Sequence, residues 1–545
     1  MAGVAPAPRG AYVLIGFMGA GKSTVAAELA EALGVRPLDS DVLLAERLGE
    51  PIAEAFDRVT VPSGAGARPA SQPAGGGDER AFRVREEELV CELLAAAEPG
   101  AVIALGGGSV LSERVRRALK SHVVVLLDVD AEEAWERVSS ADGGAERPLA
   151  RDREAFLALH AERRALYEEL ADAHLPTLAR GAASRAVGAL RALSAAAPGT
   201  RMVWARSASG DYPVLIGRGL LSAAAAGGLW QSWPLDRSLS RPFCVTDETV
   251  APLYADRLGD LAGSIAIDPG ERHKTIASAE EIWRAMIAAG ITRADHLLAL
   301  GGGVVGDLAG FCAATYQRGV PIVHVPTTLL AQVDSAYGGK TGVDLPEAKN
   351  YIGAYHQPAG VLVDPDTLAT LPAPELAAGW VEVLKTALIA GGPLWEGVAG
   401  GGEVDERAIL ACARTKLAIV AADERDAGRR QILNLGHTVG HAIETATGYA
   451  RYRHGEAVGL GLLAALRLSG AERLRGQVRE LLLARALPVT LAGASAEDVV
   501  GAIARDKKRT RSRVPFVLAH APGDVRIGCE VAPEDVQAAV EELLR

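Results

Sequence analysis

A glycine-rich stretch near the N-terminus restricts the fold of the first part of the chain. Residues 16–23 read GFMGAGKS, which matches the pattern GxxxxGK[ST]; an apolar run precedes them, and a stretch with helical spacing follows. A strand, such a loop and a helix in this order let backbone N–H groups converge on phosphate oxygens. The pattern predicts a nucleoside triphosphate site in a domain with a parallel α/β sheet.

The side chains around this loop indicate how a triphosphate and its metal would be held. Lys22 supplies a mobile cation, and Ser23 can ligate Mg²⁺. The other loop positions assigned to the site are Gly16, Gly19, Ala20, Gly21 and Thr24. The next predicted strand ends in LDSD, where Asp39 is expected to contact the metal and Asp41 a substrate hydroxyl. Helix capping is the alternative role for both carboxylates.

The spacing of apolar runs predicts three domains. Short apolar runs alternate with helix-like stretches in residues 1–196, and a linker of small residues follows at 194–200. The alternation resumes in 201–371 and indicates a Rossmann-like α/β domain, whereas 372–545 has mainly helical spacing. Residues 61–77 are rich in Gly, Pro, Ala and Ser, and we expect them to form a flexible insertion.

Charge and composition argue against several classes of partner. The formal net charge is −11, and no lysine- or arginine-rich run occurs, which argues against binding to nucleic acid or to an anionic membrane. The five cysteines are scattered without CxxC spacing, as is typical of reduced thiols. The N-terminus lacks the pattern of a signal peptide, and no apolar run is long enough to span a membrane. We expect a soluble, cytoplasmic protein.

Six motifs in order make the N-terminal domain resemble shikimate kinase. They are GFMGAGKST, LDSD, FRVREEE (82–88), ALGGGSV (104–110), ERPL (146–149) and RRALYEE (163–169). The resemblance implies ATP-dependent phosphorylation of the 3-hydroxyl of shikimate, with Asp41 orienting or deprotonating that hydroxyl. Arg147 would lie in a lid over ATP. The groups implied to hold the shikimate carboxylate and ring are Arg83, Arg163 and the turn Gly106, Gly107 and Gly108.

Two features depart from the pattern of that family. Ala165 stands where the family usually has proline, which is a small change. The insertion at 61–77 falls inside the subdomain that would bind shikimate. Phe56 and Phe82, which flank it, both match family positions, so we expect the insertion to project outward from the site.

A histidine pair raises the question of a metal site in the C-terminal half. In LGHTVGHAIE (435–444), His437 and His441 lie one turn apart on the same face of a predicted helix. Thr438 stands where a metalloprotease would carry its glutamate, which argues against that class. Taken alone, such a pair is more often an ordinary surface or core feature than a metal site.

Longer motifs make the chain from about residue 201 to its end resemble 3-dehydroquinate synthase. They are YQRG (316–319), HVPTTLLAQVDSAYGGKTGVD (324–344), KNYIGAYHQP (349–358), GWVEVLKTALI (379–389), ADERDAGRRQILNLGHTVGHAIE (422–444), HGEAVGLG (454–461) and RDKK (505–508). The resemblance implies a catalytic zinc or cobalt ion held by Glu382, His437 and His454. His441 would face the substrate instead.

The resemblance also implies an NAD⁺ site and a cationic substrate pocket. The cofactor contacts would be Gly301, Gly302, Gly303, Gly306 and Asp307 for the pyrophosphate, Asp247 for the adenosine ribose, and Glu271, Lys274, Thr327 and Thr328. The substrate pocket would contain Lys340, Lys349, Lys385, Lys416, Arg430, Asn350, Asn434 and Lys507 or Lys508 as donors, with Asp334 as its acidic group. Lys340, Lys385, Arg430, Asp334 and His441 are expected to act in catalysis. Arg318 would reach across a homodimer interface.

The implied synthase substrate is 3-deoxy-arabino-heptulosonate 7-phosphate, and the cofactor is recycled. The C5 hydroxyl would lose hydride to NAD⁺, phosphate would leave by elimination, and hydride would return before ring opening and an aldol step give 3-dehydroquinate. Two alternatives stay open. Another small-molecule kinase could be joined to another sugar-phosphate cyclase or to a metal-dependent alcohol dehydrogenase. The N-terminal domain could also be a nucleotide-binding module without catalysis.

Overall fold

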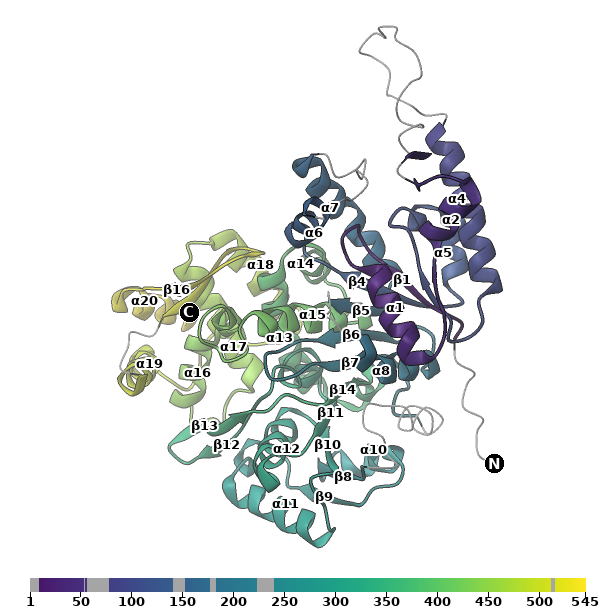
Figure 1. The fold of residues 1–545 in the computed structure, drawn as a ribbon. Helices are drawn as coiled ribbons and strands as arrows, with labels where there is room; N and C mark the ends of the chain where they lie inside the picture. Colours follow the sequence, from purple (N-terminus) through teal and green to yellow (C-terminus); the bar gives the residue numbers. More distant parts are fainter. Residues whose placement is uncertain are drawn as a thin grey trace, which may run out of the picture. The chain divides into compact units, whose positions relative to one another are not determined.

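The structure is a computed structural model whose described residues form two compact units (Figure 1). The structure describes residues 9–52, 54–55, 78–140, 152–176, 183–222, 240–510 and 515–545. Unit 1 ends at Trp204, and unit 2 begins at Ala205. The expected insertion at 61–77, Phe56 and Arg147 lie outside the described residues, as do the side chains of Lys507 and Lys508.

Unit 1 is a parallel α/β layer with strand order β2-β3-β1-β4-β5-β6. Its elements are β1 (Tyr12–Ile15), α1 (Lys22–Leu33), β2 (Pro37–Asp39), α2 (Ser40–Leu48), α4 (Asp78–Ala96), β3 (Val102–Ala104), η1 (Ser109–Leu111), α5 (Glu113–Leu119), β4 (Val123–Asp128), α6 (Ala131–Ser139), α7 (Arg153–Leu170), β5 (Ala173–Pro176), α8 (Ala183–Ala195) and β6 (Arg201–Ala205). The central strand β1 is buried along its whole length, as a strand covered on both faces requires. Because β6 pairs in parallel with β5, the strand after the expected linker belongs to the sheet of unit 1.

Unit 2 begins with a second parallel layer, with strand order β7-β14-β11-β10-β8-β9. Its elements are β7 (Tyr212–Ile216), β8 (Pro242–Asp247), α10 (Ala251–Tyr254), η3 (Ala255–Leu258), β9 (Gly263–Ile267), η4 (Glu271–His273), α11 (Ile276–Ala288), β10 (His296–Gly301), α12 (Gly303–Thr315), η5 (Tyr316–Arg318), β11 (Ile322–Pro326), η6 (Ala331–Ser335), β12 (Lys340–Leu345), β13 (Ala348–Tyr355), β14 (Gly360–Val363) and η7 (Pro365–Thr370). Strands β12 and β13 form an antiparallel hairpin outside this layer. The predicted alternation of strands and helices is confirmed.

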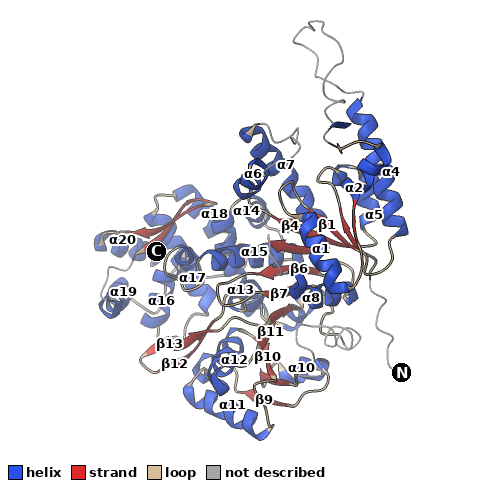
Figure 2. Ribbon diagram, viewed as in Figure 1, coloured by secondary structure: helices blue, strands red, loops and turns tan. Residues whose placement is uncertain are grey.

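The remainder of unit 2 is mainly helical, as the sequence predicts (Figure 2). Its elements are α13 (Ala373–Ala390), α14 (Gly392–Ala399), α15 (Glu406–Ala422), η8 (Arg429–Asn434), α16 (His437–Ala446), α17 (His454–Leu468), α18 (Glu472–Leu483), α19 (Ala496–Thr510), the hairpin β15 (Phe516–Ala521) and β16 (Asp524–Cys529), and α20 (Pro533–Leu543). Among the described residues, no helix combines the length and the low charge needed to cross a membrane.

Glycines let the helices α13, α16 and α17 approach one another backbone to backbone. A Cβ atom at Gly455 of α17 would lie 1.9 Å from the carbonyl oxygen of Ala378 in α13. A Cβ atom at Gly461 would lie 2.0 Å from the carbonyl oxygen of Gly436, which caps the start of α16. Any larger residue would push these helices apart. The close crossing brings side chains from all three helices to one place.

Candidate active sites

The glycine loop of unit 1 is shaped around the ammonium group of Lys22. Gly21, in the left-handed conformation with φ 83°, forms the N-cap of helix α1. Lys22 Nζ donates to the carbonyl oxygens of Gly16 at 2.9 Å and Phe17 at 3.2 Å. A Cβ atom at Gly19 would lie 2.7 Å from a neighbouring carbonyl oxygen, so only glycine fits. The loop, the lysine and the helix N-terminus together form an anion-binding arrangement.

Asp39 makes the helix cap that the sequence leaves open as an alternative, and it also bonds to the loop serine. Its Oδ1 accepts a hydrogen bond from the backbone N–H of Asp41 at 2.9 Å and so caps helix α2. Its Oδ2 accepts from Ser23 Oγ at 2.6 Å. The side chain expected at the metal is therefore already tied to the loop serine expected to share that metal, while it also starts the helix that carries Asp41.

Residues expected to hold the phosphoryl acceptor lie around the turn 106–108. A Cβ atom at Gly106 would lie 2.3 Å from Asp41 Oδ1, and one at Gly108 would lie 2.2 Å from Arg83 Nη1. The side chains of Asp41 and Arg83 therefore lie directly against the backbone of these two glycines. Glu86, a residue without a role in the sequence analysis, accepts from Arg83 Nη1 at 2.7 Å and from Ser109 Oγ at 2.9 Å. This carboxylate holds the guanidinium beside the turn.

Tyr167 connects the same turn to Arg163. Its hydroxyl donates to the carbonyl oxygen of Gly107 at 2.6 Å and shares a side-chain hydrogen bond with Arg163. Burial raises the pKa of Tyr167 above its ordinary value, although Arg163 and Arg83 act against that rise. Tyr167 therefore remains a hydrogen-bond donor at neutral pH. The RRALYEE motif contains it, but nothing in its spacing indicates this contact.

Close packing where β10 meets α12 requires glycine at two positions of the loop in unit 2. A Cβ atom at Gly301 would lie 2.7 Å from Val305, and one at Gly302 would lie 3.0 Å from Thr328 Cγ2. The backbone N–H of Thr327 donates to the carbonyl oxygen of Gly301 at 3.0 Å, which holds the next strand end beside the loop. The Thr327 hydroxyl is buried and has no hydrogen-bond partner among the described residues.

Asp247 stands at the end of strand β8, where the sequence analysis expects a contact with a ribose. Its Oδ1 accepts from the backbone N–H groups of Thr249 and Val250, both at 2.9 Å. The side chain therefore caps the turn after the strand. Its assignment to the ribose stays a prediction.

Lys274 lies at the centre of a buried charge cluster. Lys274 and two of its partners, Glu271 and Asp307, are expected at the cofactor, and its third partner, Asn350, is expected at the substrate. Only 2% of Lys274 is exposed. Its Nζ donates to Asp307 Oδ2 at 3.1 Å and to Asn350 Oδ1 at 2.6 Å, and it lies 3.4 Å from Glu271 Oε1. Burial alone would lower the pKa of Lys274, but the neighbouring carboxylates raise it. The lysine is charged, and it ties helix α12 to strand β13.

A second cluster of charges surrounds Asp334, which lies on the π-helical turn η6. Asp334 Oδ1 lies 2.5 Å from Lys416 Nζ, and Oδ2 lies 3.5 Å from Lys385 Nζ. Burial alone would raise the pKa of Asp334, but the two lysines hold it well below its ordinary range. Burial lowers the pKa of Lys416 despite its carboxylate partner. Single π-helical turns often occur at functional sites.

Other expected substrate residues are held by different partners. Arg430 is buried, and its guanidinium donates to the backbone carbonyl oxygens of Gly338, at 2.9 Å, and Glu424. Lys340 is half exposed and pairs with Asp426. Arg318 lies exposed at the end of η5 with φ 70°, and Asn434 ends η8. The structure thus brings Lys385, Lys416 and Asp334 into one cluster, and it leaves the roles of these four residues as predictions.

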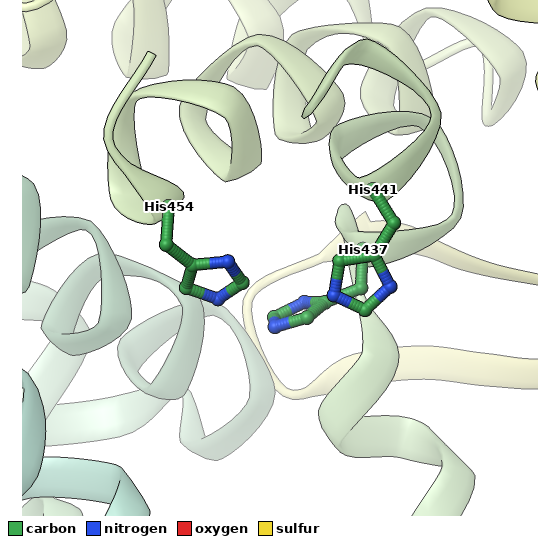
Figure 3. Close-up of side chains that lie close together, drawn as sticks. All are labelled: His437, His441 and His454. Atoms are coloured by element: carbon green, nitrogen blue, oxygen red, sulfur yellow. The ribbon is translucent and has the colours of Figure 1, made fainter. Parts of the chain in front are cut away.

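Three histidines converge where α16 and α17 meet (Figure 3), and a buried glutamate of α13 lies beside two of them. The imidazoles of His437, His441 and His454 offer nitrogen atoms that lie within 4.8 Å of one another. Oε1 of Glu382, which has no exposed surface, lies 3.8 Å from His437 Nε2 and 3.6 Å from His454 Nε2. Two possible sets of metal ligands therefore overlap. One is the three histidines, and the other is the expected set of Glu382, His437 and His454.

The electrostatic state of this cluster suits a cation. Burial lowers the pKa of His437 well below its ordinary value, so its ring is neutral at pH 7 and carries a free lone pair. The Glu382 oxygens accept no hydrogen bond of normal geometry from described residues, although Lys385 Nζ lies 2.5 Å from Oε2. One carboxylate and two imidazoles form a typical catalytic zinc donor set.

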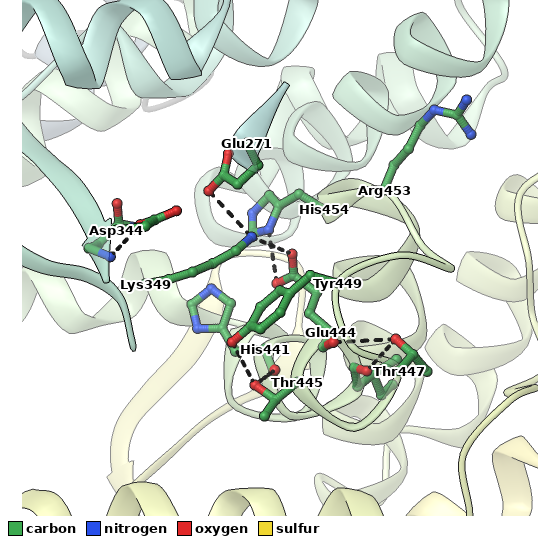
Figure 4. Close-up of polar contacts among 12 residues, drawn as sticks. Glu271, Asp344, Lys349, His441, Glu444, Thr445, Thr447, Tyr449, Arg453 and His454 are labelled. Atoms are coloured by element: carbon green, nitrogen blue, oxygen red, sulfur yellow. Dashed lines mark hydrogen bonds and ion pairs between the residues drawn. The ribbon is translucent and has the colours of Figure 1, made fainter. Parts of the chain in front are cut away.

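Glu444 completes the surroundings of this cluster and is missing from the sequence-based assignment (Figure 4). It lies on α16, with its Oε2 3.3 Å from His454 Nδ1 and its Oε1 3.6 Å from Lys349 Nζ. Lys349 in turn lies 3.3 Å from Glu271 Oε1. An acidic residue seven positions after His437 on a helix returns to the same face, and that spacing was the signal available in the sequence.

Models of two known families match this chain. The N-terminal model of 3-dehydroquinate synthase matches residues 264–378, and its C-terminal model matches 379–509. The shikimate kinase model matches 18–62 and 75–191, and its gap falls inside the expected insertion.

A curated relative and two solved structures are similar to this chain over about three fifths of its length. The 3-dehydroquinate synthase of Halorhodospira halophila is 43% identical over 353 residues, which cover 61% of this chain and 97% of the relative. A solved 2-epi-5-epi-valiolone synthase from Streptomyces hygroscopicus, with NAD⁺ and Zn²⁺ bound, is 28% identical, covers 61% of this chain and 96% of its own, and has a TM-score of 0.55. A 2-deoxy-scyllo-inosose synthase with NAD⁺ and Co²⁺, at 23% identity, a TM-score of 0.56 and coverage of 63% and 99%, shares the fold. The chain belongs to the 3-dehydroquinate synthase family, and it carries a shikimate kinase domain ahead of the synthase.

Proposed function

We propose that the protein catalyses two separate steps of aromatic biosynthesis. The kinase domain phosphorylates the 3-hydroxyl of shikimate with ATP, and the synthase converts 3-deoxy-arabino-heptulosonate 7-phosphate to 3-dehydroquinate and phosphate. The observation that carries the proposal is that both family matches lie in one chain, and each contains its own cluster of charged side chains. We assign the kinase to residues 1–196, the cofactor domain of the synthase to 201–371, and its metal and substrate domain to 372–545.

In the kinase, the acceptor hydroxyl is proposed to lie between Asp41 and Arg83 at the turn 106–108. Asp41 Oδ1 lies so close to the backbone of Gly106 that a Cβ atom there would stand 2.3 Å from it, so the carboxylate is held beside the turn. The carboxylate then accepts the hydroxyl proton as phosphoryl transfer proceeds, and Arg83 and Arg163 bind the shikimate carboxylate. Lys22 and the loop N–H groups bind ATP, and Ser23 and Asp39 suit Mg²⁺ because their oxygens already lie 2.6 Å apart.

In the synthase, the residues present fit a divalent metal. The support is Glu382 Oε1, which accepts no hydrogen bond from described residues, and the two imidazole Nε2 atoms that face this oxygen. We assign zinc or cobalt to Glu382, His437 and His454. When bound, the ion polarises the substrate oxygen that is oxidised and later reduced. His441, one turn beyond His437, is assigned to the substrate.

The residues around the second glycine loop also fit a dinucleotide. The loop leaves backbone without side chains where β10 enters α12, and the buried Thr327 hydroxyl lacks a partner among described residues. We assign NAD⁺ to this loop and to Asp247, Glu271, Lys274, Asp307 and Thr328. NAD⁺ supplies a temporary acceptor for hydride, so the reaction shows no net redox change.

The chain's own charges are proposed to hold the substrate and move protons. Lys385 and Lys416, on either side of Asp334, supply two positive charges in a buried pocket despite the acidic net charge. Such charges bind a carboxylate or phosphate more strongly than exposed lysines do, because the surroundings screen them less. Lys340, Lys349, Arg430, Asn350, Asn434 and Lys507 are assigned to the same pocket.

Assembly and location are part of the proposal. We infer a homodimer through the synthase half, with Arg318 reaching the partner, because Arg318 is exposed at the end of η5. We also infer a cytoplasmic location. The five cysteines form no disulfide, which suits a reducing compartment.

The full chain provides the test of function. With shikimate and ATP it should form ADP only when shikimate is present. With the heptulosonate phosphate and NAD⁺ it should release phosphate without accumulating NADH. Absence of the first activity would favour an N-terminal domain that binds nucleotide without catalysis, and another accepted sugar phosphate would favour a different cyclase.

A further inference from the structure

The two presumed histidine ligands use their ring nitrogens in the same way. His437 Nε2 and His454 Nε2 both face Glu382 Oε1, at 3.8 and 3.6 Å. The opposite nitrogen of each ring has an acceptor: His437 Nδ1 lies 3.1 Å from the carbonyl oxygen of Leu435, and His454 Nδ1 lies 3.3 Å from Glu444 Oε2. In each ring the proton therefore belongs on Nδ1, which leaves the Nε2 lone pair directed at the metal position.

The acceptor for His454 is unusual because it is a buried charge. Glu444 is 4% exposed, and a carboxylate at that depth costs free energy unless it is paired. Its second oxygen, Oε1, lies 3.6 Å from Lys349 Nζ (Figure 4). One oxygen thus serves the histidine and the other a lysine. Glu444 Oε2 meets Nδ1 of His454, whereas Glu382 lies beside Nε2 on the opposite edge of the ring, so Glu444 contacts the ring from the side away from the proposed metal position.

Lys349 is itself fixed from three directions. Its Nζ lies 3.3 Å from Glu271 Oε1 and 4.4 Å from the centre of the Tyr449 ring. Tyr449 is held by its backbone N–H, which donates to the Glu444 carbonyl oxygen at 2.8 Å, and by its hydroxyl, which lies 2.9 Å from Thr445 Oγ1. A cation over an aromatic face gains electrostatic stabilisation. The lysine is thereby held in position to pair with Glu444.

We propose that Glu444 is a positioning residue that fixes the tautomer and ring orientation of His454, and that Lys349 keeps this carboxylate in place. A chain of contacts, Glu271 to Lys349 to Glu444 to His454, then joins the side of unit 2 assigned to NAD⁺ to the side assigned to the metal. This inference rests on the proposed metal site. It explains why an acidic side chain is kept in a buried position without contacting the metal position directly.

The test is the metal affinity of Glu444→Gln in the full chain, measured for Zn²⁺ by competition with a chromogenic chelator. Glutamine keeps the shape but removes the charge and allows its NH₂ group to face the ring nitrogen. Loss of such a partner typically weakens metal binding roughly 10- to 100-fold. With Co²⁺ in place of Zn²⁺, the visible absorption bands should shift because the ring is no longer held in one orientation. The matched control is Glu375→Gln, which removes the carboxylate that pairs with Arg453, the neighbour of His454.

The outcomes separate this inference from the proposal on which it depends. Weaker Zn²⁺ binding and shifted Co²⁺ bands in Glu444→Gln, with the metal-free unfolding midpoint and the control close to the parent, support the positioning role. Unchanged affinity and bands overturn it, as does a lower midpoint of the metal-free protein without any change in affinity. If the parent and His437→Ala bind equal amounts of metal, the proposed metal site itself is wrong.

Discussion

His454 Nε2 lies 3.6 Å from Glu382 Oε1, although helices α14, α15 and α16 separate the two residues in the sequence. The contact depends on the glycine crossings that let α17 approach α13 and the start of α16. His437 Nε2 faces the same oxygen, and His441 offers a nitrogen within 4.8 Å of those of His437 and His454, so two possible donor sets overlap at this place.

The two histidines of α16 should respond differently to substitution. His437→Ala should lose bound metal and synthase activity together, because its nitrogen faces Glu382 from a buried position. His441→Ala should keep its metal and lose turnover, because the exposed His441 is assigned to substrate. Elemental analysis and initial rates measure both. Equal metal loss in the two variants would instead favour the cluster of three histidines.

In the kinase domain, Asp41→Asn should abolish shikimate phosphorylation while leaving ATP binding nearly unchanged. An amide cannot accept the hydroxyl proton, and loss of such a group typically lowers the rate roughly 100-fold or more. Lys22 and the loop carry the nucleotide, so Lys22→Ala should weaken both binding and turnover. Titration calorimetry with an ATP analogue, beside the rate, separates the effects. Near-normal turnover in Asp41→Asn would contradict the assigned contact.

Features set by a few adjacent residues were predictable from the sequence. Both glycine loops follow a buried strand and open a helix, as expected, because the positive φ at Gly21 and the crowding at Gly301 are local requirements. Asp39 was assigned either to a cap or to a metal contact, and it makes the cap and the Ser23 bond together. Local spacing does not show that one carboxylate can cap a helix and bond to the loop serine at the same time, and the metal contact of Asp39 stays a prediction.

Contacts that depend on packing between distant helices were less predictable. Glu444 was missed because the sequence of a helix does not show which residue pairs with a buried acid, and its partner Lys349 lies on a strand. Tyr449, whose ring faces the same lysine, was missed for the same reason. Arg430 is expected at the substrate, which stays a prediction, and nothing in the sequence indicates that its guanidinium also donates to two backbone carbonyl groups. Strand β6 joins the sheet of unit 1 beyond the expected linker, because strand pairing is not visible in a run of apolar residues.

The buried pair of Lys416 and Asp334 should matter for stability as well as for substrate binding. Lys416→Met leaves Asp334 with one lysine instead of two, and breaking a buried pair typically costs about 3–5 kcal/mol. Lys340→Met is the matched control, since that lysine is 49% exposed and such surface pairs contribute at most about 1 kcal/mol. Urea unfolding followed by tryptophan fluorescence compares the two. If Lys416→Met and Lys340→Met shifted the urea midpoint by similarly small amounts, the buried pair would not contribute the expected stability.

Asp295 should make stability depend on pH. Burial alone would raise its pKa, but hydrogen bonds from Arg241 and Thr292 lower it from 3.8 to about 2. Because the folded pKa is the lower one, the stabilisation is present above the ordinary pKa and is lost as pH falls through the folded value. The shift corresponds to about 2 kcal/mol.

Asp295→Asn should therefore be less stable than the parent near neutral pH, with a difference that shrinks as pH falls below about 4 toward the folded pKa. Denaturant unfolding of both proteins across that range measures the difference. A difference that stays constant with pH would show that the charge of Asp295 is not its source.

We propose that one chain holds two independent active sites. The most direct test is to measure the initial rates of both reactions in the parent, in Asp41→Asn and in Glu382→Gln, each purified as the full chain. Asp41→Asn should lose only shikimate-dependent ADP formation, and Glu382→Gln should lose only NAD⁺-dependent phosphate release. Loss of both rates in either variant, or of neither rate, would contradict this proposal.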